Sequence, residues 1–242
     1  MLLADRIVLV TGAAGALGSA IMAAVREQGG IAFGTDLAPG PGIDMQQDVT
    51  REEGWSRVCA EIERRHGRLD GLVNNAGIIH VGSVEDTDLA AFRKVMAVNV
   101  DGVFLGCKLC WPLLRRSDAA SIVNVSSTAG LVGSANHVAY NSSKGAVRLM
   151  SKCVALQGAK LDPVVRCNSL HPSLMPGNMA ETIVGGSEDS AAAIAALVAA
   201  RNPMRRLART SEVAGAVVFL LSGLSSFVTG SELVTDGGST AI

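Results

Sequence analysis

Short runs of β-branched and other apolar residues alternate along this chain with longer segments in which apolar residues recur at helical spacing. Runs of the first kind favour strands, and segments of the second kind favour amphipathic helices. The predicted strands are Arg6–Val10, Ile31–Thr35, Leu69–Val73, Ser121–Val125, Val164–Leu170 and Glu232–Thr235. The predicted helices are Ala16–Gln28, Thr50–His66 with Thr50 as N-cap, Glu85–Leu114, a helix from Tyr140 to about Gln157, and Ser211–Ser222. This alternation predicts an α/β fold, a parallel sheet with helices on both faces, in a single domain over residues 1–242.

Two segments depart from this rhythm. Between Thr35 and Gln46 the sequence Asp-Leu-Ala-Pro-Gly-Pro-Gly is turn chemistry, so this crossover has room for little or no helix. Residues 172–203 form a long Met- and Ala-rich insertion before the last strand, predicted to be helical near Glu188–Ala200. An insertion of this length predicts a lid over a substrate site.

Composition narrows the possible functions. Hydrophobic residues make up 48% of the chain and charged residues 18%, which predicts a large core rather than disorder. Aromatic residues are only 3%, so we expect an aliphatic core. The net charge of -1 gives no reason to expect binding to nucleic acid or to a membrane. The apolar run Ala191–Ala200 is too short to span a bilayer.

The chain has five cysteines, an odd number, and no recognisable signal peptide. This favours a reducing, cytoplasmic location over a disulfide framework. Cys107 and Cys110 have the spacing of a redox or metal motif, but they lie in an apolar helical run without a second pair nearby. We therefore expect buried thiols there, and no metal site.

A glycine-rich turn follows the first predicted strand and opens the first helix, with Gly12, Gly15 and Gly18 as its glycines. Such glycines permit a tight turn and close approach of the backbone to a pyrophosphate, which the helix N-terminus attracts. Asp36, at the end of the second strand, could accept hydrogen bonds from both hydroxyls of an adenosine ribose and would repel a 2′-phosphate. No Lys or Arg occurs between Arg26 and Arg51, so the sequence favours NAD over NADP.

Tyr140 is the only tyrosine of the chain, and Lys144 follows it by four residues. On a helix this spacing places both side chains on one face. A nearby cation would stabilise the phenolate and lower the pKa of Tyr140, which would make the phenol a possible acid and base.

These residues, together with others, resemble the motifs of the short-chain dehydrogenase/reductases in the branch of roughly 250 residues. The matching positions are the glycine-rich turn, Asp48-Val49, Asn74-Asn75-Ala76-Gly77, Asn99, Ser127 at 13 residues before the tyrosine, Tyr140 with Lys144, and Asp236-Gly237-Gly238. The resemblance covers essentially the whole chain and implies a doubly wound Rossmann fold of about seven strands.

The resemblance also implies roles for these residues. Hydride would pass between nicotinamide C4 and a carbonyl carbon, with Tyr140 as acid and base, Ser127 bonded to the same oxygen, and Lys144 on the ribose hydroxyls. Asn99 would hold a water in a proton relay from Lys144. Cofactor contacts would come from Gly12, Gly15, Ala16, Leu17, Gly18, Asp36, Asp48, Val49, Asn75, Ala76, Gly77, Tyr140, Lys144 and Pro172. The resemblance further implies a homotetramer, with the long helices and the Leu233–Ile242 tail at its interfaces.

Two departures from the family pattern stand out. Ala16 occupies the usual place of the middle glycine, whereas Gly15 precedes it, so a methyl group should lie near the pyrophosphate. Ser173 follows Pro172 where the family usually has glycine, which could change the path of the lid.

The sequence also offers candidate residues for the substrate site. His80 and His137 are candidates for the substrate mouth, and Leu174, Met175, Met179 and Ile183 offer a flexible apolar wall. The absence of Lys and Arg over 172–200 favours a neutral hydrophobic secondary alcohol or ketone, cyclic or steroid-like. One alternative is a 3-oxoacyl-carrier-protein reductase using NADPH, which Asp36 disfavours. The other is a catalytically silent nucleotide-sensing or scaffold protein, which the intact Ser/Tyr/Lys set disfavours.

Overall fold

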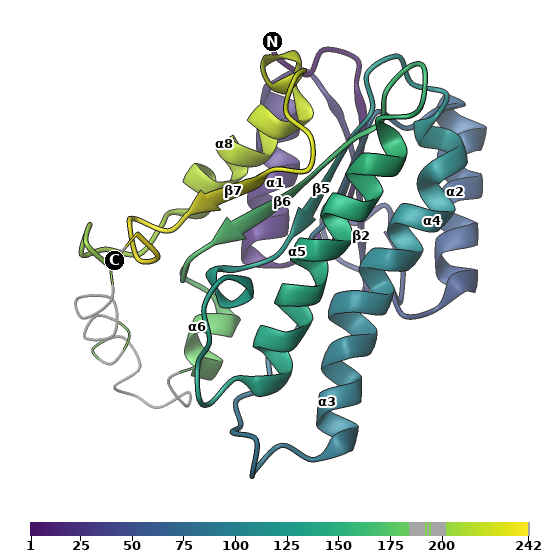
Figure 1. Ribbon diagram of the computed structural model, residues 1–242. Coiled ribbons are helices and arrows are strands. Elements are labelled where there is room, and N and C mark those ends of the chain that lie inside the picture. Colours follow the sequence, from purple (N-terminus) through teal and green to yellow (C-terminus); the bar gives the residue numbers. More distant parts are fainter. Residues whose placement is uncertain (184–191, 193, 195–201, 242) are drawn as a thin grey trace.

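The computed structural model describes residues 1–183, 192, 194 and 202–241. Its centre is one sheet of seven parallel strands in the order β3-β2-β1-β4-β5-β6-β7 (Figure 1). The strands are β1 (Ile7–Thr11), β2 (Ile31–Asp36), β3 (Met45–Gln46), β4 (Gly71–Asn74), β5 (Ser121–Val125), β6 (Arg166–Pro172) and β7 (Glu232–Thr235). The predicted doubly wound parallel sheet is confirmed, and β3 is the short strand that residue pattern alone did not locate.

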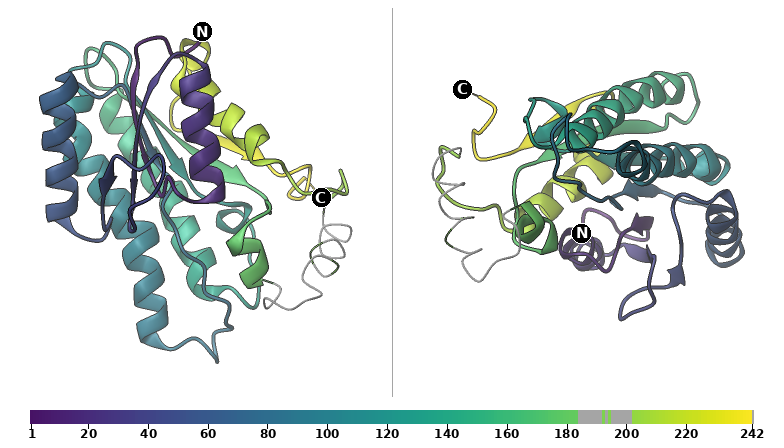
Figure 2. Two further views of the ribbon diagram at one scale, coloured as in Figure 1. Left: turned by 180° about the vertical axis from the view of Figure 1, so that it is seen from behind. Right: turned by 90° about the horizontal axis from the view of Figure 1, so that it is seen from below.

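Helices cover both faces of the sheet (Figure 2). On one face lie α1 (Ala16–Glu27) and α8 (Thr210–Leu221), and on the other α2 (Glu52–His66), α4 (Gly102–Leu114) and α5 (Val138–Gly158). Two shorter helices, α3 (Leu89–Met96) and α6 (Asn178–Ile183), extend beyond the carboxyl ends of the strands. The crossover from β2 to β3 contains no helix among these described residues, as its turn-forming sequence predicts.

Each face of the sheet has its own hydrophobic core. One core packs α1 and α8 residues such as Ile21 and Val217 against Val10 and Val123. The other packs α2, α4 and α5 against the alternate residues of the same strands and includes the fully buried Trp55. Because successive strand residues point to opposite faces, a strand buried on both sides must be apolar throughout, as the continuous apolar runs predict.

Two helices begin later than the pattern predicts. The carboxylate of Asp48 accepts hydrogen bonds from both the N–H and the hydroxyl of Thr50, so Thr50 belongs to a turn and α2 begins at Glu52. The helix predicted from Glu85 begins at Leu89, because Asp88 caps it by accepting from the N–H of Ala91 at 2.7 Å. The helix predicted near Glu188–Ala200 lies outside the described residues, apart from 192 and 194.

Among the residues that the structure describes, one helical segment, Leu89–Leu114, is long and apolar enough by length and composition to cross a membrane. Half of its most apolar window is buried inside the fold, which is the pattern of a core helix. Its middle, Ala97–Asp101, is a π-helical turn that joins α3 to α4.

Candidate active site

The site lies at the carboxyl edge of the sheet, where β1 and β4 are neighbours and their crossovers lead to opposite sides of the sheet. Ligands of open α/β sheets bind at such a switch point. The hydroxyl of Thr11, at the end of β1, accepts hydrogen bonds from the N–H groups of Asn75 at 3.0 Å and Ala76 at 3.1 Å. The side-chain amide of Asn75 in turn donates to the carbonyl oxygens of Thr11 and Gly12. The glycine-rich turn and the loop of residues 75–78 after β4, which we call the Asn75 loop, are therefore bonded to each other.

The glycine-rich turn has the geometry that its sequence predicts. Gly12 has a φ of 64°, in the left-handed region that favours glycine. A Cβ on Gly18 would collide with the carbonyl oxygen of Gly12, so the helix can approach the turn only without a side chain there. Gly15 is the N-cap of α1, and within the described part of the chain no side chain caps this helix end. Its first N–H groups thus remain open to an anion.

Ala16 lies next to Gly177, in the segment that follows β6. A Cβ on Gly177 would lie 3.1 Å from the methyl group of Ala16, so the two chain segments touch at this point. The departure from the family glycine is therefore matched by a residue without a side chain on the opposite segment. Pro172 is the last residue of β6, and Ser173 donates its N–H to the carbonyl oxygen of Thr235 on β7.

Asp36 is held at the rim of the glycine-rich turn. One carboxylate oxygen accepts from the N–H of Ala14 at 2.9 Å, and the other accepts from the N–H of Leu37 at 2.7 Å. Both oxygens keep further acceptor capacity, because a carboxylate can accept about four hydrogen bonds. Asp36 is thus placed to receive two adjacent hydroxyl groups.

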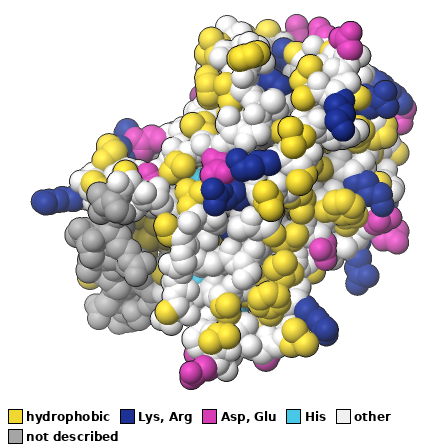
Figure 3. Space-filling view, in the orientation of Figure 1, with side chains coloured by type: hydrophobic (Ala, Val, Ile, Leu, Met, Phe, Trp, Pro, Cys, Tyr) yellow, Lys and Arg dark blue, Asp and Glu magenta, His cyan; other side chains and the backbone are white. Residues whose placement is uncertain are grey.

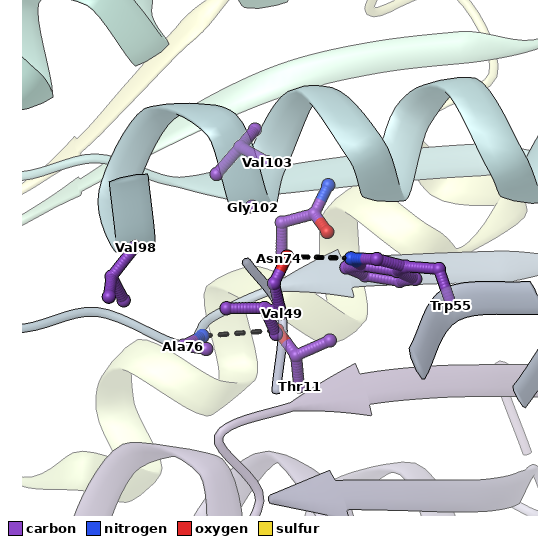
Figure 4. A pocket seen from close by; sticks show the side chains of 8 residues that line it. All are labelled: Thr11, Val49, Trp55, Asn74, Ala76, Val98, Gly102 and Val103. Carbon is purple, nitrogen blue, oxygen red and sulfur yellow. Dashed lines mark hydrogen bonds between the residues drawn. The ribbon is translucent and has the colours of Figure 1, made fainter. Parts of the chain in front are cut away.

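A small pocket lies next to the switch point (Figure 4). It is lined by Thr11, Val49, Trp55, Asn74, Ala76, Val98, Gly102 and Val103. The indole N–H of Trp55 donates to the carbonyl oxygen of Val49 at 2.9 Å, which fixes the residue that follows Asp48. The hydrogen bonds from Thr50 hold the pKa of Asp48 below its usual value, so this carboxylate remains charged.

Tyr140 and Lys144 lie on α5 and are both buried. The ammonium nitrogen of Lys144 lies 5.6 Å from the centroid of the Tyr140 ring and donates to the carbonyl oxygen of Val125 at 2.8 Å. The phenol of Tyr140 donates to the sulfur of Met179 on α6 at 3.7 Å. The predicted pairing on one helix face is present, and α6 covers the phenol.

The expected lowering of the pKa of Tyr140 by Lys144 is wrong. Burial raises the pKa of Tyr140, and only the hydrogen bond with Ser127 opposes this rise. Burial also lowers the pKa of Lys144 to about 8. Spacing in the sequence gives the proximity of the two groups but not their desolvation, and here desolvation decides the direction.

Ser127 follows β5 and lies at the Tyr140 hydroxyl, close enough to act on its pKa. Its hydroxyl oxygen accepts from the N–H of Ala129 at 3.1 Å, which leaves the hydroxyl proton for another partner. Its carbonyl oxygen accepts from the N–H of Gly130 and from the ring of His171, each at 2.9 Å. Three of the four residues of the predicted catalytic set, Ser127, Tyr140 and Lys144, are thus brought together.

Asn99 is fully buried in the π-helical turn. Its amide nitrogen donates to the carbonyl oxygen of Ile78 at 2.9 Å and to the hydroxyl of Ser143 at 3.0 Å, and its amide oxygen accepts from the N–H of Ile78 at 2.9 Å. A Cβ on Gly77 would lie 3.3 Å from that oxygen and 3.5 Å from the Lys144 nitrogen. Asn99 therefore binds the Asn75 loop to α5 beside Lys144, whereas the water relay stays a prediction.

The candidate substrate residues separate into two groups. His80 and His137 are half-buried, and a bridge between Gly82 and His137 places their segments side by side, whereas their role at the substrate mouth stays a prediction. Met179 reaches Tyr140, but Met175 packs against the core of the α1 and α8 face. Leu174 and Ile183 are partly exposed, and their place in the substrate wall stays a prediction.

All five cysteines are free thiols. Cys107 and Cys110 are buried, as expected, and burial raises the pKa of Cys107 to about 12. Among the described residues, no group of three His, Cys, Asp or Glu side chains is placed to hold a metal ion.

Three comparisons define the class of this protein. A family model described as enoyl-(acyl carrier protein) reductase matches residues 12–240. The chain is 36% identical to a cyclopentanol dehydrogenase of Comamonas testosteroni over 98% of each chain, and 39% identical to an NADP-dependent (R)-specific alcohol dehydrogenase of Lentilactobacillus kefiri over 81% of this chain and 76% of that one. The ligand-free aldohexose dehydrogenase of Thermoplasma acidophilum has a TM-score of 0.91 at 31% identity, over 99% of this chain and 95% of that one.

Fold, site and comparisons together define a nicotinamide-dependent oxidoreductase that acts on a CH–OH group. The chain belongs to the short-chain dehydrogenase/reductase family.

Sequence reasoning missed several residues of the site. Val98 lines the pocket beside Asn99, Ser143 bonds to the Asn99 amide, and His171 bonds to Ser127. Ser143 lies one helical turn from Tyr140, which was a usable signal. The contact between His171 and Ser127 joins two strand ends 44 residues apart, so only the paired sheet reveals it.

Proposed function

We propose that this enzyme transfers a hydride between NAD(H) and a neutral, hydrophobic secondary alcohol or ketone, cyclic or steroid-like, with Tyr140 as the acid and base. The observation that carries the proposal is the buried Tyr140 hydroxyl, which lies beside Ser127 and one helical turn from Lys144. The similarity to a cyclopentanol dehydrogenase supports a cyclic alcohol.

We assign a dinucleotide to the switch point at the carboxyl edge of the sheet. The open N-terminus of α1 and the bare backbone at Gly12 and Gly18 would hold the pyrophosphate, and Asp36 would bind the adenosine ribose. Val49 and Ala76 would contact the adenine ring from the pocket wall, next to Asp48, and Lys144 would reach the nicotinamide ribose. When bound, the nicotinamide supplies or accepts the hydride.

The protein side of the reaction is the handling of one proton and one oxygen atom. In reduction, Tyr140 donates its phenolic proton to the carbonyl oxygen, and in oxidation it accepts the hydroxyl proton. Ser127 donates its hydroxyl proton to a hydrogen bond with the same oxygen and fixes the position of that oxygen. The substrate oxygen takes the place at the phenol that the Met179 sulfur holds here, so the segment over residues 172–203 acts as the lid.

The test is an assay of cyclopentanol, cyclohexanol and steroidal alcohols with NAD and with NADP. We expect turnover with NAD, and loss of at least about 100-fold in kcat for Tyr140→Phe, which keeps the ring and removes the proton. Retention of Tyr140→Phe activity would contradict the proposed role. Absence of turnover with every substrate, despite NAD binding, would favour the silent nucleotide-sensing protein.

Asp36 is the basis for NAD over NADP. We expect Asp36→Ala to raise KM for NAD by about tenfold, because it removes hydrogen bonds to a charged group worth about 1.5 kcal/mol or more. The same variant should improve the use of NADP, because the repulsion of the 2′-phosphate is removed. Equal or better rates of the unaltered enzyme with NADP would overturn this assignment, which matters because a similar enzyme is NADP-dependent.

A carrier-linked 3-oxoacyl reductase is the second candidate, because the matching family model is described as an enoyl reductase that likewise acts on a carrier-bound acyl group. It would use NADPH, which the carboxylate of Asp36 opposes. Acetoacetyl-coenzyme A with NADPH is the discriminating substrate pair, and faster turnover there than with any cyclic alcohol and NAD would establish this alternative.

We also propose a cytoplasmic homotetramer that binds neither nucleic acid nor membrane. Figure 3 shows hydrophobic side chains over α4 and α5. Phe104 on α4 and Leu149 and Leu156 on α5 are each at least half exposed. Exposed apolar faces of this kind mark interfaces. Light scattering after gel filtration should give a tetramer, and Leu149→Lys should dissociate it, whereas Val84→Lys, in an exposed loop, should not. A wild-type monomer would refute the assembly.

A further inference from the structure

His171 is a fully buried histidine on β6 with both ring nitrogens hydrogen-bonded. Nδ1 lies 2.9 Å from the carbonyl oxygen of Ser127, and Nε2 lies 2.8 Å from the hydroxyl oxygen of Ser169. A carbonyl oxygen can only accept, so the proton of the neutral ring must be on Nδ1. Nε2 then accepts from the Ser169 hydroxyl at 2.8 Å, in preference to the carbonyl oxygen of Ser231, which lies 3.5 Å from that hydroxyl, and these partners define the tautomer of His171.

This imidazole lies where the pairing of β5 with β6 ends. The last backbone hydrogen bond between the two strands is donated by the N–H of Ser126 to the carbonyl oxygen of Leu170, at 2.8 Å. Pro172 follows His171 and has no N–H to donate, so the backbone of β6 offers the chain beyond Ser126 no further donor at that position. The side chain of His171 supplies the missing donor and extends the connection by one residue, to Ser127.

The same short segment is held on its other side by α5. Lys144 donates to the carbonyl oxygen of Val125, and the Ser126 hydroxyl donates to the carbonyl oxygen of Lys144, both at 2.8 Å. The carbonyl oxygen of Ser127 receives no bond from α5 among these contacts, so His171 and the turn to Gly130 orient this peptide. The direction of the peptide sets where the Ser127 hydroxyl points.

We propose that His171 is a positioning residue of the reaction: its Nδ1–H holds the Ser127 carbonyl and thereby aims the Ser127 hydroxyl at the reacting oxygen beside Tyr140. The inference rests on the proposed function, which assigns Ser127 to that oxygen. Burial lowers the pKa of His171, which keeps the ring neutral and the tautomer fixed at neutral pH.

Two amide substitutions separate this role from mere filling of space. The amide nitrogen of His171→Asn takes the place of Nδ1 and can still donate to Ser127, whereas the amide of His171→Gln reaches toward Ser169 instead. Both replace a buried ring by a polar amide, so they share the loss of packing. Circular dichroism and thermal melts check that each variant is folded.

The first readout needs neither substrate nor cofactor. Ser127 opposes the rise of the Tyr140 pKa, so a displaced Ser127 should let that pKa rise further. Absorbance titration at 295 nm should show an upward shift in His171→Gln and in Ser127→Ala, and none in His171→Asn. In the Ser127→Ala background, His171→Gln should add no further shift, because it acts through a hydroxyl that is absent.

The second readout is turnover of cyclopentanol with NAD. We expect kcat to fall by at least about tenfold in His171→Gln, with the dissociation constant for NAD unchanged, and His171→Asn to stay within about threefold of wild type. The inference would be overturned if the two amide variants had the same Tyr140 pKa and the same kcat. It would also be overturned if His171→Gln lowered kcat as much in the Ser127→Ala variant as in the wild type. A Ser127→Ala variant that keeps its activity would instead refute the proposed role of Ser127, and the titration would still decide whether His171 positions it.

Discussion

At high pH the single tyrosine of this chain should titrate above the ordinary phenol value, and removal of its neighbouring lysine should hardly change that result. Burial raises the pKa of Tyr140 and lowers the pKa of Lys144 to about 8. As the pH rises, the lysine therefore loses its proton before the tyrosine does. The cation that the sequence pattern supplies is no longer charged when the phenolate forms.

The geometry gives the size of the stabilisation that a charged Lys144 would provide to the Tyr140 phenolate. A charge at the 5.6 Å that separates the Lys144 nitrogen from the ring centroid would stabilise the phenolate by about 3 kcal/mol at an effective dielectric constant of about 20. This energy corresponds to about two pKa units. At pH 10 a lysine with a pKa of about 8 is about 1% protonated, so almost none of this stabilisation remains.

The assay is a spectrophotometric titration at 295 nm of the unliganded protein and of Lys144→Met, with circular dichroism at each pH to confirm that the fold persists. With one tyrosine in the chain, the whole phenolate signal belongs to Tyr140. We expect a pKa above 10 in both proteins. A value below 10 in the wild type that rises by about two units in Lys144→Met would refute the reasoning, because it would mean that the buried lysine stays charged.

Three further predictions concern stability. Between pH 8 and about 10.5 the unfolded chain binds more protons at Lys144 than the folded protein does. The free energy of unfolding of the wild type should therefore rise by up to about 3 kcal/mol relative to that of Lys144→Met across this range. Urea unfolding measures this difference, and a fall of the difference with rising pH would contradict the burial of Lys144. Gly18→Ala should lower Tm by about 5 °C or more, whereas Gly15→Ala, whose Cβ would lie 3.4 Å from the nearest atom, should melt like the wild type; equal melts of the two variants would exclude the collision. Arg148 and a neighbouring lysine lower the pKa of Glu232 to about 2, so Glu232→Gln should lower the free energy of unfolding by about 1 kcal/mol at pH 7. Unfolding measured at falling pH should show this difference vanish between about pH 4.5 and 2. A difference that persists at pH 2 would mean that the substitution removes packing instead.

The order of strands and helices was predictable because it depends on local spacing. The pairing of Tyr140 with Lys144 was predictable for the same reason, since four residues make one helical turn. The strand β3 was not, because two residues carry no periodicity. The π-helical turn around Asn99 also has no mark in the local pattern, and it becomes visible only through the bonds that Ile78 and Ser143 make to the Asn99 amide.

Properties that depend on tertiary structure were harder to predict. The direction of the Tyr140 pKa depends on how far α5 and α6 exclude water, which no spacing records. Met175 and Met179 look equivalent in the sequence, but the first packs into the core and only the second reaches the phenol. The chemical identity of the site was thus readable from residue types, whereas its electrostatics required the fold.

The bonds around Thr11 have a consequence for how a cofactor would bind. Because one hydroxyl group joins the glycine-rich turn to the Asn75 loop, the protein's own hydrogen bonds fix the floor of the switch point. Ordering a loop when a ligand binds costs conformational entropy. The glycine-rich turn and the Asn75 loop are already held by hydrogen bonds, so they should add little to this cost. Affinity should then follow the quality of individual contacts, such as those of Asp36, and Thr11→Val should weaken association mainly through a less favourable entropy.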